Sequence, residues 1–210
     1  MPELPELRGR HVVLEPMTAA HVDELLAAAT GDRSTFRFTP IPGDRPAMAR
    51  YVEKAEAARD AGTQVPLVSR RLTDGRVVGS TRFYDLEYWD WSSSAPGPAS
   101  SRSGPGPDTA NIGYTWLVPD AQRSPINTEA KLLMLGHAFE AWQVRVVRIQ
   151  TDARNQRSRR AIERLGCTLD GIIRRQRPAA DGDVRDTALY SMVTEEWPTA
   201  RAALEAHLNP

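Results

Sequence analysis

Short apolar runs alternate along the chain with longer stretches in which apolar residues recur every three or four positions. The first run, residues 10–17, has a β-branched apolar centre and predicts a strand. Thr18 then precedes a stretch in which Val22, Leu25 and Leu26 share one helical face. The chain is therefore predicted to begin with a strand followed by a helix.

A second helix and a hairpin come next. Asp44 is suited to cap this helix, Pro46 to its first turn and Gly62 to its end. Residues 65–86 hold two strand-like runs around Asp74-Gly75, a dipeptide that readily supplies the positive φ of a tight turn. We expect these two strands to pair in antiparallel fashion.

From residue 110 onward the pattern is regular. It predicts a strand at 110–118, a helix at 126–142, a strand at 144–152 and a helix at 155–166. This alternation implies a crossover unit that joins two parallel strands. Two further strands around Asp181-Gly182 and a closing amphipathic helix complete the chain. The prediction is an α/β fold in one domain over residues 1–210, with seven strands and about five helices.

Residues 92–108 are almost wholly Ser, Pro, Gly and Ala. Such a composition cannot bury enough surface to offset its ordering entropy, so an inserted loop is predicted. The GPGPDT sequence within it resembles a dinucleotide fingerprint only weakly, because its prolines lack amide donors and no strand leads into it. A flexible linker is the favoured interpretation.

Composition excludes several classes of function. Lys+Arg and Asp+Glu both number 27, so no overall field favours nucleic acid or an anionic membrane. The single cysteine, Cys167, rules out an intramolecular disulfide and a cysteine-cluster zinc site, and no metal is expected. Since no apolar run approaches the ~18 residues of a membrane span, a cytoplasmic protein is predicted.

The start of the helix after residue 118 is the first candidate site. A helix N-terminus leaves about four backbone N–H groups without partners and carries a partial positive charge, so it attracts phosphate. Ser124 is suited to be the cap and Pro125 the first helical residue, while Asn127 and Thr128 add side-chain donors. Most capped helices bind nothing, so further support is required.

The start of the next helix is the second candidate. Asn155 is suited to cap it, and Ser158 lies near its first turn. Residues 145–177 contain ten arginines against three acids, a local excess of seven. Arginine suits phosphate because its planar fork donates two hydrogen bonds at once. The alternative is an ordinary solvated helix face. The chain contains only two lysines, so arginine is its general surface cation.

Together these segments resemble a GNAT-type acyl-CoA N-acyltransferase of the branch that includes the ribosomal-protein alanine acetyltransferases RimJ and RimL. The residues that carry the resemblance are IGYTWLVPDAQR, NTEAKLLML and HAFE, then DARNQRSRRAIERLG, RRQRPAADGDVRDTALYS and the closing EEW. The order of predicted elements agrees with that of the family fold. The resemblance implies acetyl-CoA in a cleft where the fourth and fifth strands splay apart.

The resemblance also implies which residues hold this cosubstrate. A backbone N–H near Leu117 would polarise the thioester carbonyl. The full implied cofactor-binding set is Leu117, Val118, Gln122, Arg123, Ser124, Pro125, Ile126, Asn127, Thr128, Asn155 and Ser158. The family's diphosphate loop has two glycines where this chain has Pro125 and Asn127, which removes one amide donor and adds a side chain.

The position that holds the general acid in many family members also differs in this chain. Many members place a Tyr where this chain has Ile162, which cannot donate a proton. In the RimL-like branch a Ser occupies the position of Ser158, so this hydroxyl is implied to hydrogen-bond the cofactor sulfur; the alternative is a surface serine in the first turn of the helix. Leu117 and Ser158 are thus the two residues predicted to contact the reacting atoms.

The general base stays open. Asp85 and Glu87 end the third strand, and carboxylates at strand ends are usually just solvated. His137 is interpreted as a packed or surface residue and Cys167 as a small apolar filler. The acceptor is also open: the Trp89-Asp90-Trp91 stretch would either floor an acceptor pocket, cover the sheet edge or form a contact in a homodimer.

Two hypotheses of different classes follow. In the first, the protein is an N-acetyltransferase that moves an acetyl group from acetyl-CoA to a primary amine by direct attack in a ternary complex. In the second, it keeps the fold as a catalytically silent CoA-binding or protein-interaction module. Nucleic-acid binding by the arginine-rich stretch ranks third, because the overall charge is neutral.

Overall fold

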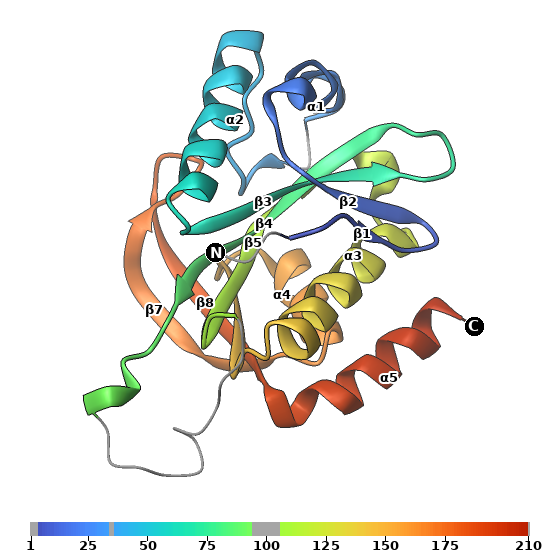
Figure 1. Ribbon diagram of the computed structural model, residues 1–210. Coiled ribbons are helices and arrows are strands. Elements are labelled where there is room, and N and C mark those ends of the chain that lie inside the picture. The colour runs from blue at the N-terminus through green and yellow to red at the C-terminus, as the bar shows by residue number, and fades with distance from the viewer. Residues whose placement is uncertain (1–3, 34–35, 94–105, 210) are drawn as a thin grey trace.

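The computed structural model describes residues 4–33, 36–93 and 106–209 and contains one mixed sheet (Figure 1). Its strand order is β1-β2-β3-β4-β5-β6-β8-β7. The strands are β1 Leu7–Arg8, β2 Val12–Pro16, β3 Gln64–Arg71, β4 Val77–Glu87, β5 Thr109–Leu117, β6 Val146–Asp152, β7 Thr168–Pro178 and β8 Val184–Val193. The seven predicted strands are confirmed, and β1 is an eighth, too short to leave a periodic pattern.

The five predicted helices are also confirmed. They are α1 Val22–Ala29, α2 Arg45–Asp60, α3 Pro125–Gly136, α4 Gln156–Arg164 and α5 Trp197–Leu208. Asp44, Ser124 and Asn155 cap α2, α3 and α4 through their side chains, as predicted. The predicted helix at 126–142 changes to a π-helix at His137–Ala141. Within the described residues, no helix is long and apolar enough to cross a membrane.

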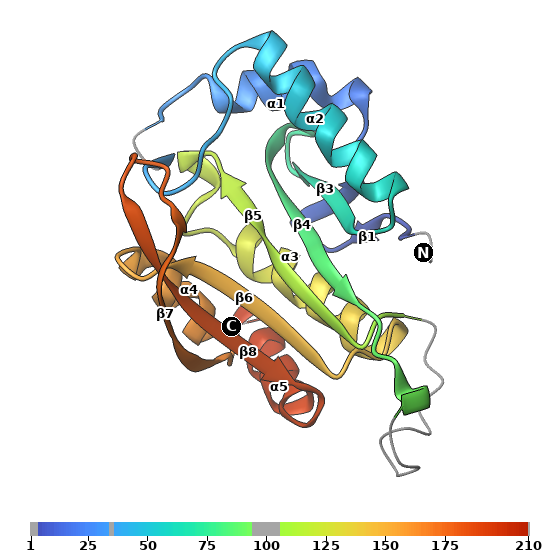
Figure 2. The same ribbon diagram turned by 90° about the vertical axis from the view of Figure 1, so that its left-hand side faces the viewer.

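The helices cover both faces of the sheet. Figure 2 shows α1 and α2 on one face, with α3, α4 and α5 on the other. The contacts agree, because Tyr51 of α2 lies 3.1 Å from the Ser80 hydroxyl on one face. On the opposite face Lys131 of α3 donates to Thr81, the next residue of β4. We call these the α2 face and the α3 face.

The sheet opens between β5 and β6, the one parallel pair in the described strands. Their last registered pair is Ile112 with Ile149, although β5 continues to Leu117 and β6 to Asp152. The register of β4 with β5 shifts in the same region, where Tyr114 has a φ of 52°. This bulge adds twist to β5, and the predicted splay between the fourth and fifth long strands is confirmed.

Glu129 of α3 anchors the N-terminal hairpin. Its buried carboxylate accepts three backbone N–H groups, from Arg10 at 2.8 Å, His11 at 2.7 Å and Val12 at 2.9 Å. A Cβ at Gly9 would lie 2.3 Å from the Glu129 side chain, so a glycine is required there. The turn between β1 and β2 is thereby fixed to a helix more than a hundred residues further along the chain.

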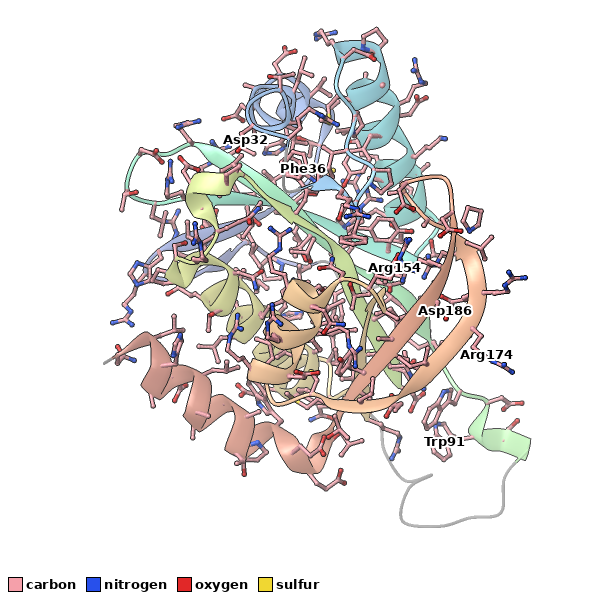
Figure 3. All side chains as sticks on the ribbon, turned by 180° about the vertical axis from the view of Figure 1, so that it is seen from behind. Asp32, Phe36, Trp91, Arg154, Arg174 and Asp186 are labelled. Atoms are coloured by element: carbon pink, nitrogen blue, oxygen red, sulfur yellow. The ribbon has the colours of Figure 1, made fainter. Side chains whose placement is uncertain are left out.

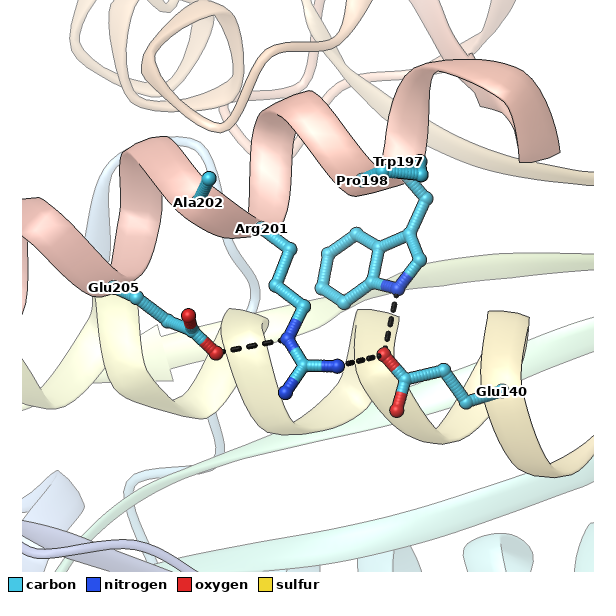
Figure 4. Close-up of a pocket in the computed structure, with 6 residues that line it drawn as sticks. All are labelled: Glu140, Trp197, Pro198, Arg201, Ala202 and Glu205. Atoms are coloured by element: carbon cyan, nitrogen blue, oxygen red, sulfur yellow. Dashed lines mark hydrogen bonds and ion pairs between the residues drawn. The ribbon is translucent and has the colours of Figure 1, made fainter.

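The closing helix α5 is fastened to the π-helical turn by one carboxylate (Figure 4). Glu140 accepts from Trp197 Nε1 at 2.8 Å and from Arg201 at 2.7 Å, while Arg201 also binds Glu205 at 2.8 Å. These residues line a shallow hollow on the surface, and their polar groups bind one another. This network is a structural contact between α5 and the end of α3.

The Glu129 anchor predicts a specific loss of stability. In Glu129→Gln the amide NH₂ replaces one acceptor oxygen and faces a backbone N–H, leaving a buried donor without a partner. We expect the free energy of unfolding to fall by about 2 kcal/mol in urea titration. Glu53→Gln, the same change at an exposed position of α2, is the control and should stay within about 0.5 kcal/mol of the parent. Equal stability of the two variants would contradict the anchor.

Candidate active site

The backbone of β5 presents polar groups to the opening. Val118 N–H donates to Val78 O at 2.8 Å, which pairs it with β4. Because the ladder alternates, the N–H of the preceding residue, Leu117, points away from β4 and toward the side where β6 has separated. Leu117 is buried, and its carbonyl accepts from Gln122 Nε2 at 2.9 Å. The predicted carbonyl-polarising N–H thus lies at the edge of the opening.

The turn into α3 is organised by Ser124. Its hydroxyl donates to Ala121 O at 2.6 Å and accepts from the Ile126 amide at 3.3 Å. The Ser124 hydroxyl and the Ile126 amide were predicted to help bind a diphosphate. In this structure they are hydrogen-bonded to each other, and the hydroxyl also bonds the Ala121 carbonyl of the turn. The Ile126 side chain belongs to the hydrophobic core.

The other predicted residues of this turn differ in exposure. Arg123 is exposed and adopts a left-handed φ of 58°, and Pro125 is exposed at the first helical position. Asn127 and Thr128 are half-buried in the first turn of α3. Arg123, Asn127 and Thr128 are therefore the side chains of this turn that are suited to meet an anion.

The start of α4 lies beside this turn. The Asn155 side chain accepts from the Ser158 amide at 3.1 Å, and Ser158 is half-buried. Arg157, between them, donates to Gln122 Oε1 at 2.8 Å. The structure therefore brings the two predicted helix starts together. Ile162, at the position where many family members have Tyr, is buried in the core.

Part of the arginine excess of residues 145–177 is bound by partners from other segments. Arg145 pairs with Asp108 at 3.2 Å and Arg148 with Glu87 at 3.5 Å. Arg159 donates to the Tyr190 hydroxyl at 2.9 Å. Arg145, Arg148 and Arg159 are each bound to a separate partner, so these three do not act together as one anion site.

Arg154 connects three segments around the mouth of the opening (Figure 3). It binds Asp152 at the end of β6 at 2.7 Å, and Asp181 and Asp183 at the tip of the β7–β8 hairpin at 3.2 and 3.3 Å. Its guanidinium also lies 5.7 Å from the Phe38 ring in the segment between α1 and α2. The hydrogen bond from Arg154 lowers the pKa of the Asp152 carboxyl.

The two carboxylates considered as bases are engaged. Asp85 accepts from Asn111 at 3.1 Å. Glu87 accepts from Thr109 at 2.9 Å, and chiefly this hydrogen bond lowers the pKa of the Glu87 carboxyl. Both carboxylates thus have hydrogen-bond partners on β5, and Glu87 is held in its ionised form.

His137 and Cys167 are packed residues. Burial lowers the pKa of His137, whose ring meets Trp142 edge-on at 4.9 Å. Burial raises the pKa of the Cys167 thiol to about 12. Neither group lies on the turns that flank the opening. Within the described residues, no three His, Cys, Asp or Glu side chains group as a metal site would require.

The aromatic stretch after β4 lies away from the opening. The Trp89 amide donates to Asp108 at 2.9 Å and Trp91 Nε1 donates to the same carboxylate at 3.2 Å. Asp108 directly precedes β5, whereas the opening begins beyond Ile112. This position favours a cover for the sheet edge or a contact surface over the floor of an acceptor pocket. The predicted loop 92–108 lies mostly outside the described residues.

Lys131 is a buried group that the sequence analysis did not single out. Its ammonium group donates to Thr81 Oγ1 at 2.9 Å and to Thr115 Oγ1, in the β5 bulge, at 2.8 Å. Burial lowers the pKa of Lys131 to about 7. Its spacing from Met134 and Leu135 on the buried side of α3 is the sequence signal that could have revealed it.

Known proteins share this architecture. The acetyltransferase (GNAT) domain family matches residues 11–168. A GCN5-related N-acetyltransferase from Brucella melitensis has a TM-score of 0.82 and 28% identity over 100% of this chain and 87% of its own. A putative acetyltransferase from T. thermophilus has a TM-score of 0.77 and 32% identity over 99% of this chain and 100% of its own.

A more distant neighbour bears on the predicted branch. Mycobacterium smegmatis RimJ in complex with CoA-disulfide has a TM-score of 0.74 and 21% identity, covering 93% of this chain and 88% of its own. At this identity the likeness concerns the fold. No curated protein matches the sequence.

The family match covers most of the chain, so the protein belongs to the GNAT acetyltransferase family. This confirms the resemblance on which the sequence analysis depended. The family consists of acetyl-CoA-dependent N-acetyltransferases, and the predicted enzyme class is confirmed at that level.

Lys131 predicts a dependence of stability on pH. Its pKa is about 7 when folded and about 10.4 when unfolded, so above pH 7 the unfolded state binds more protons. Stability should therefore rise between pH 7 and 8.5, by about 1 to 2 kcal/mol from this group. The control is Lys131→Met; the Thr81 and Thr115 hydroxyls lie 2.8 Å apart and can bond each other once the ammonium group is removed. Urea titrations in which both proteins show the same pH slope would contradict the assignment.

Proposed function

We propose that the protein is an N-acetyltransferase that uses acetyl-CoA and acetylates a primary amine, either a protein N-terminus or a small-molecule amine, in a ternary complex. The observation that carries this proposal is the 2.8 Å hydrogen bond from Arg157 to Gln122. It holds the starts of α3 and α4 together beside the opening between β5 and β6. Two helix N-termini and a cation at one place suit a phosphorylated ligand.

The diphosphate of CoA fits the turn that begins at Gln122. Pro125 has no N–H, and the Ser124 hydroxyl and the Ile126 amide are bonded to each other, so few backbone donors are available here. We assign the main contacts to side chains instead: Arg123, Asn127 and Thr128 on the turn, and Arg157 from α4. The two arginines supply the stronger contacts, because charge-assisted hydrogen bonds to phosphate are about twice as strong as neutral ones.

The reacting end belongs at the end of β5. When bound, acetyl-CoA supplies the acetyl thioester that the amine attacks. The Leu117 N–H is directed to this place and is suited to stabilise negative charge on the carbonyl oxygen. Val118 gives its amide to β4 and so serves to fix the strand. Asn155 positions the first turn of α4, from which Ser158 offers its hydroxyl to the sulfur.

The demands on acid and base are modest. A thiol with a pKa near 8.5 leaves well as the thiolate, so one hydroxyl such as that of Ser158 suffices to assist it. An α-amino group with a pKa of about 8 is about one tenth neutral at pH 7, which supplies an attacking amine without a strong base. Holding the reactants in line then provides much of the acceleration. We assign no covalent step to a side chain of the protein.

Arg157→Gln tests the seat of the diphosphate. Losing one charge-assisted hydrogen bond should raise the KM for acetyl-CoA about tenfold and leave kcat within about twofold. The measurement is amine-dependent release of free thiol. Arg164→Gln removes an exposed arginine from the far end of the same helix and should leave KM unchanged. Equal KM values in the two variants would place the diphosphate elsewhere.

A thermal-unfolding assay separates the two functional hypotheses. Acetyl-CoA at ~100-fold its dissociation constant should stabilise the protein by ~2.7 kcal/mol. Thiol release across a panel of amines and N-terminal peptides then supports the enzyme. Stabilisation without thiol release on that panel supports a silent CoA-binding module. Absence of stabilisation refutes the enzyme and the CoA-binding module and favours a protein-interaction module.

A further inference from the structure

Three arginines on the α2 face are hydrogen-bonded to neutral groups. Arg82 donates to Gln64 Oε1 at 3.0 Å, and Arg177 donates to Gln150 Oε1 at 3.0 Å. Arg185 donates to the Thr187 hydroxyl at 2.9 Å. In the parts of the chain that the structure describes, none of the three has a carboxylate oxygen within 4.0 Å. This is unlike the paired arginines described above.

Arg82 is the most buried of the three, with 4% of its surface exposed. Its guanidinium lies between two aromatic rings, 4.6 Å from the centre of Tyr51 and 4.7 Å from that of Tyr114. Cation–π contacts offset part of the cost of burial. Even so, its Nε–H is buried and donates to no acceptor in the described structure. A buried cation of this kind favours a nearby anion.

Arg177 and Arg185 face each other directly across β7 and β8. Like charges in this position are destabilising unless an anion lies between or beside them. Burial and then the Arg177 charge lower the pKa of Arg185. Asp152 is the nearby acid, but its two oxygens are bound by Arg154 at 3.0 and 2.7 Å.

These arginines form one cluster at the opening. Tyr84 connects them. Its ring meets that of Tyr114 at 5.2 Å, and it is paired with Asn111, which is in register with Arg148, two residues before the Gln150 that Arg177 binds. Tyr114 lies two residues beyond Ile112 on β5, and Gln150 directly follows Ile149 on β6. The cluster therefore borders both strands where they separate. It lies on the face opposite to α3 and α4, which carry the proposed cofactor residues (Figure 2).

The cluster also contains an acceptor without a donor. Asn111 gives its NH₂ group to Asp85, while its Oδ1 is buried and accepts from no donor in the described structure. Asn111 and Tyr84 are opposite each other on β5 and β4, so their side chains share the α2 face. One place thus offers cationic donors and a vacant carbonyl acceptor.

We propose that this cluster selects the acceptor: a primary amine that also carries an anionic oxygen group, a carboxylate or a phosphate. This inference rests on the proposed function and adds the class of acceptor. Arg177 and Arg185 bind the anionic group, and Asn111 Oδ1 accepts an N–H of the amine. Arg82 holds the rings of Tyr51 and Tyr114 in place, and its buried positive charge adds to the attraction for the anionic group. The amine then enters the opening from the face opposite to the cosubstrate.

The test compares amines that are matched except for charge. The carboxylate arm uses α-amino acids with their own carboxamides, and the phosphate arm uses phosphoethanolamine with ethanolamine. Thiol release from acetyl-CoA gives kcat/KM, corrected for the neutral fraction of each amine. We expect the anionic member to be preferred at least tenfold in one arm, and the arm concerned identifies the group. A neutral preference, or none, in both arms overturns the proposal.

Variants attribute the preference to the cluster. In Arg177→Gln with Arg185→Gln, kcat/KM for the anionic amine should fall at least tenfold, while that for the neutral partner stays within twofold. Arg174→Gln is the matched control, because Arg174 lies on the same strand but lines a separate hollow with Arg175 and Asp186. Figure 3 labels Arg174 and Asp186. An equal loss for both amines, or the same loss in the control, overturns the proposal.

A binding readout keeps this test apart from that of the proposed function. If acetyl-CoA stabilises the protein but no amine releases thiol, the catalytic proposal fails by itself. The proposal for the cluster would still be supported if the anionic amine, but not its neutral partner, stabilised the CoA-bound protein and if this effect were lost in the Arg177 and Arg185 double variant. No stabilisation by any anionic amine of either arm would overturn it.

Discussion

The separation of β5 from β6 is the constraint on which the rest of this structure depends. Pairing ends at Ile112 and Ile149 while both strands continue, and the bulge at Tyr114 turns β5 away. Backbone N–H and C=O groups that would pair with the neighbouring strand in a continuous sheet are directed into the gap instead. The starts of α3 and α4 reach it from one face, and the arginine cluster borders it on the other. One break in a ladder thus creates a passage with two chemically different entrances.

Two buried basic side chains flank the bulge, and neither has an ionic partner among the described residues. Lys131 lies beneath it and binds two threonine hydroxyls, one of them on the bulged strand. Arg82 lies above it, between aromatic rings. Burying such groups costs stability, so the region that shapes the site is less stable than an apolar core of the same size would be. A sheet built only for stability would have neither residue.

Local features of this fold were predictable from the sequence, and features that depend on register were not. Asp44, Ser124 and Asn155 cap helices because a cap needs only its next three residues. The bond between Gln122 and Arg157 joins residues that are distant in sequence, and its formation requires both helix starts to be in place. The arginine cluster depends on the pairing of β7 with β8 and on the one-residue shift in β5. No pattern of alternation reveals such a shift in advance.

The anchor at Glu129 constrains the order in which the chain is completed during synthesis. The three amides that it binds belong to residues 10–12, so a nascent chain that has not yet reached α3 holds them without their partner. Contacts of such long sequence separation form late and slow folding. The turn between β1 and β2 is therefore secured only after α3 has been made, and a chain truncated before α3 would lack this anchor at the edge of the sheet.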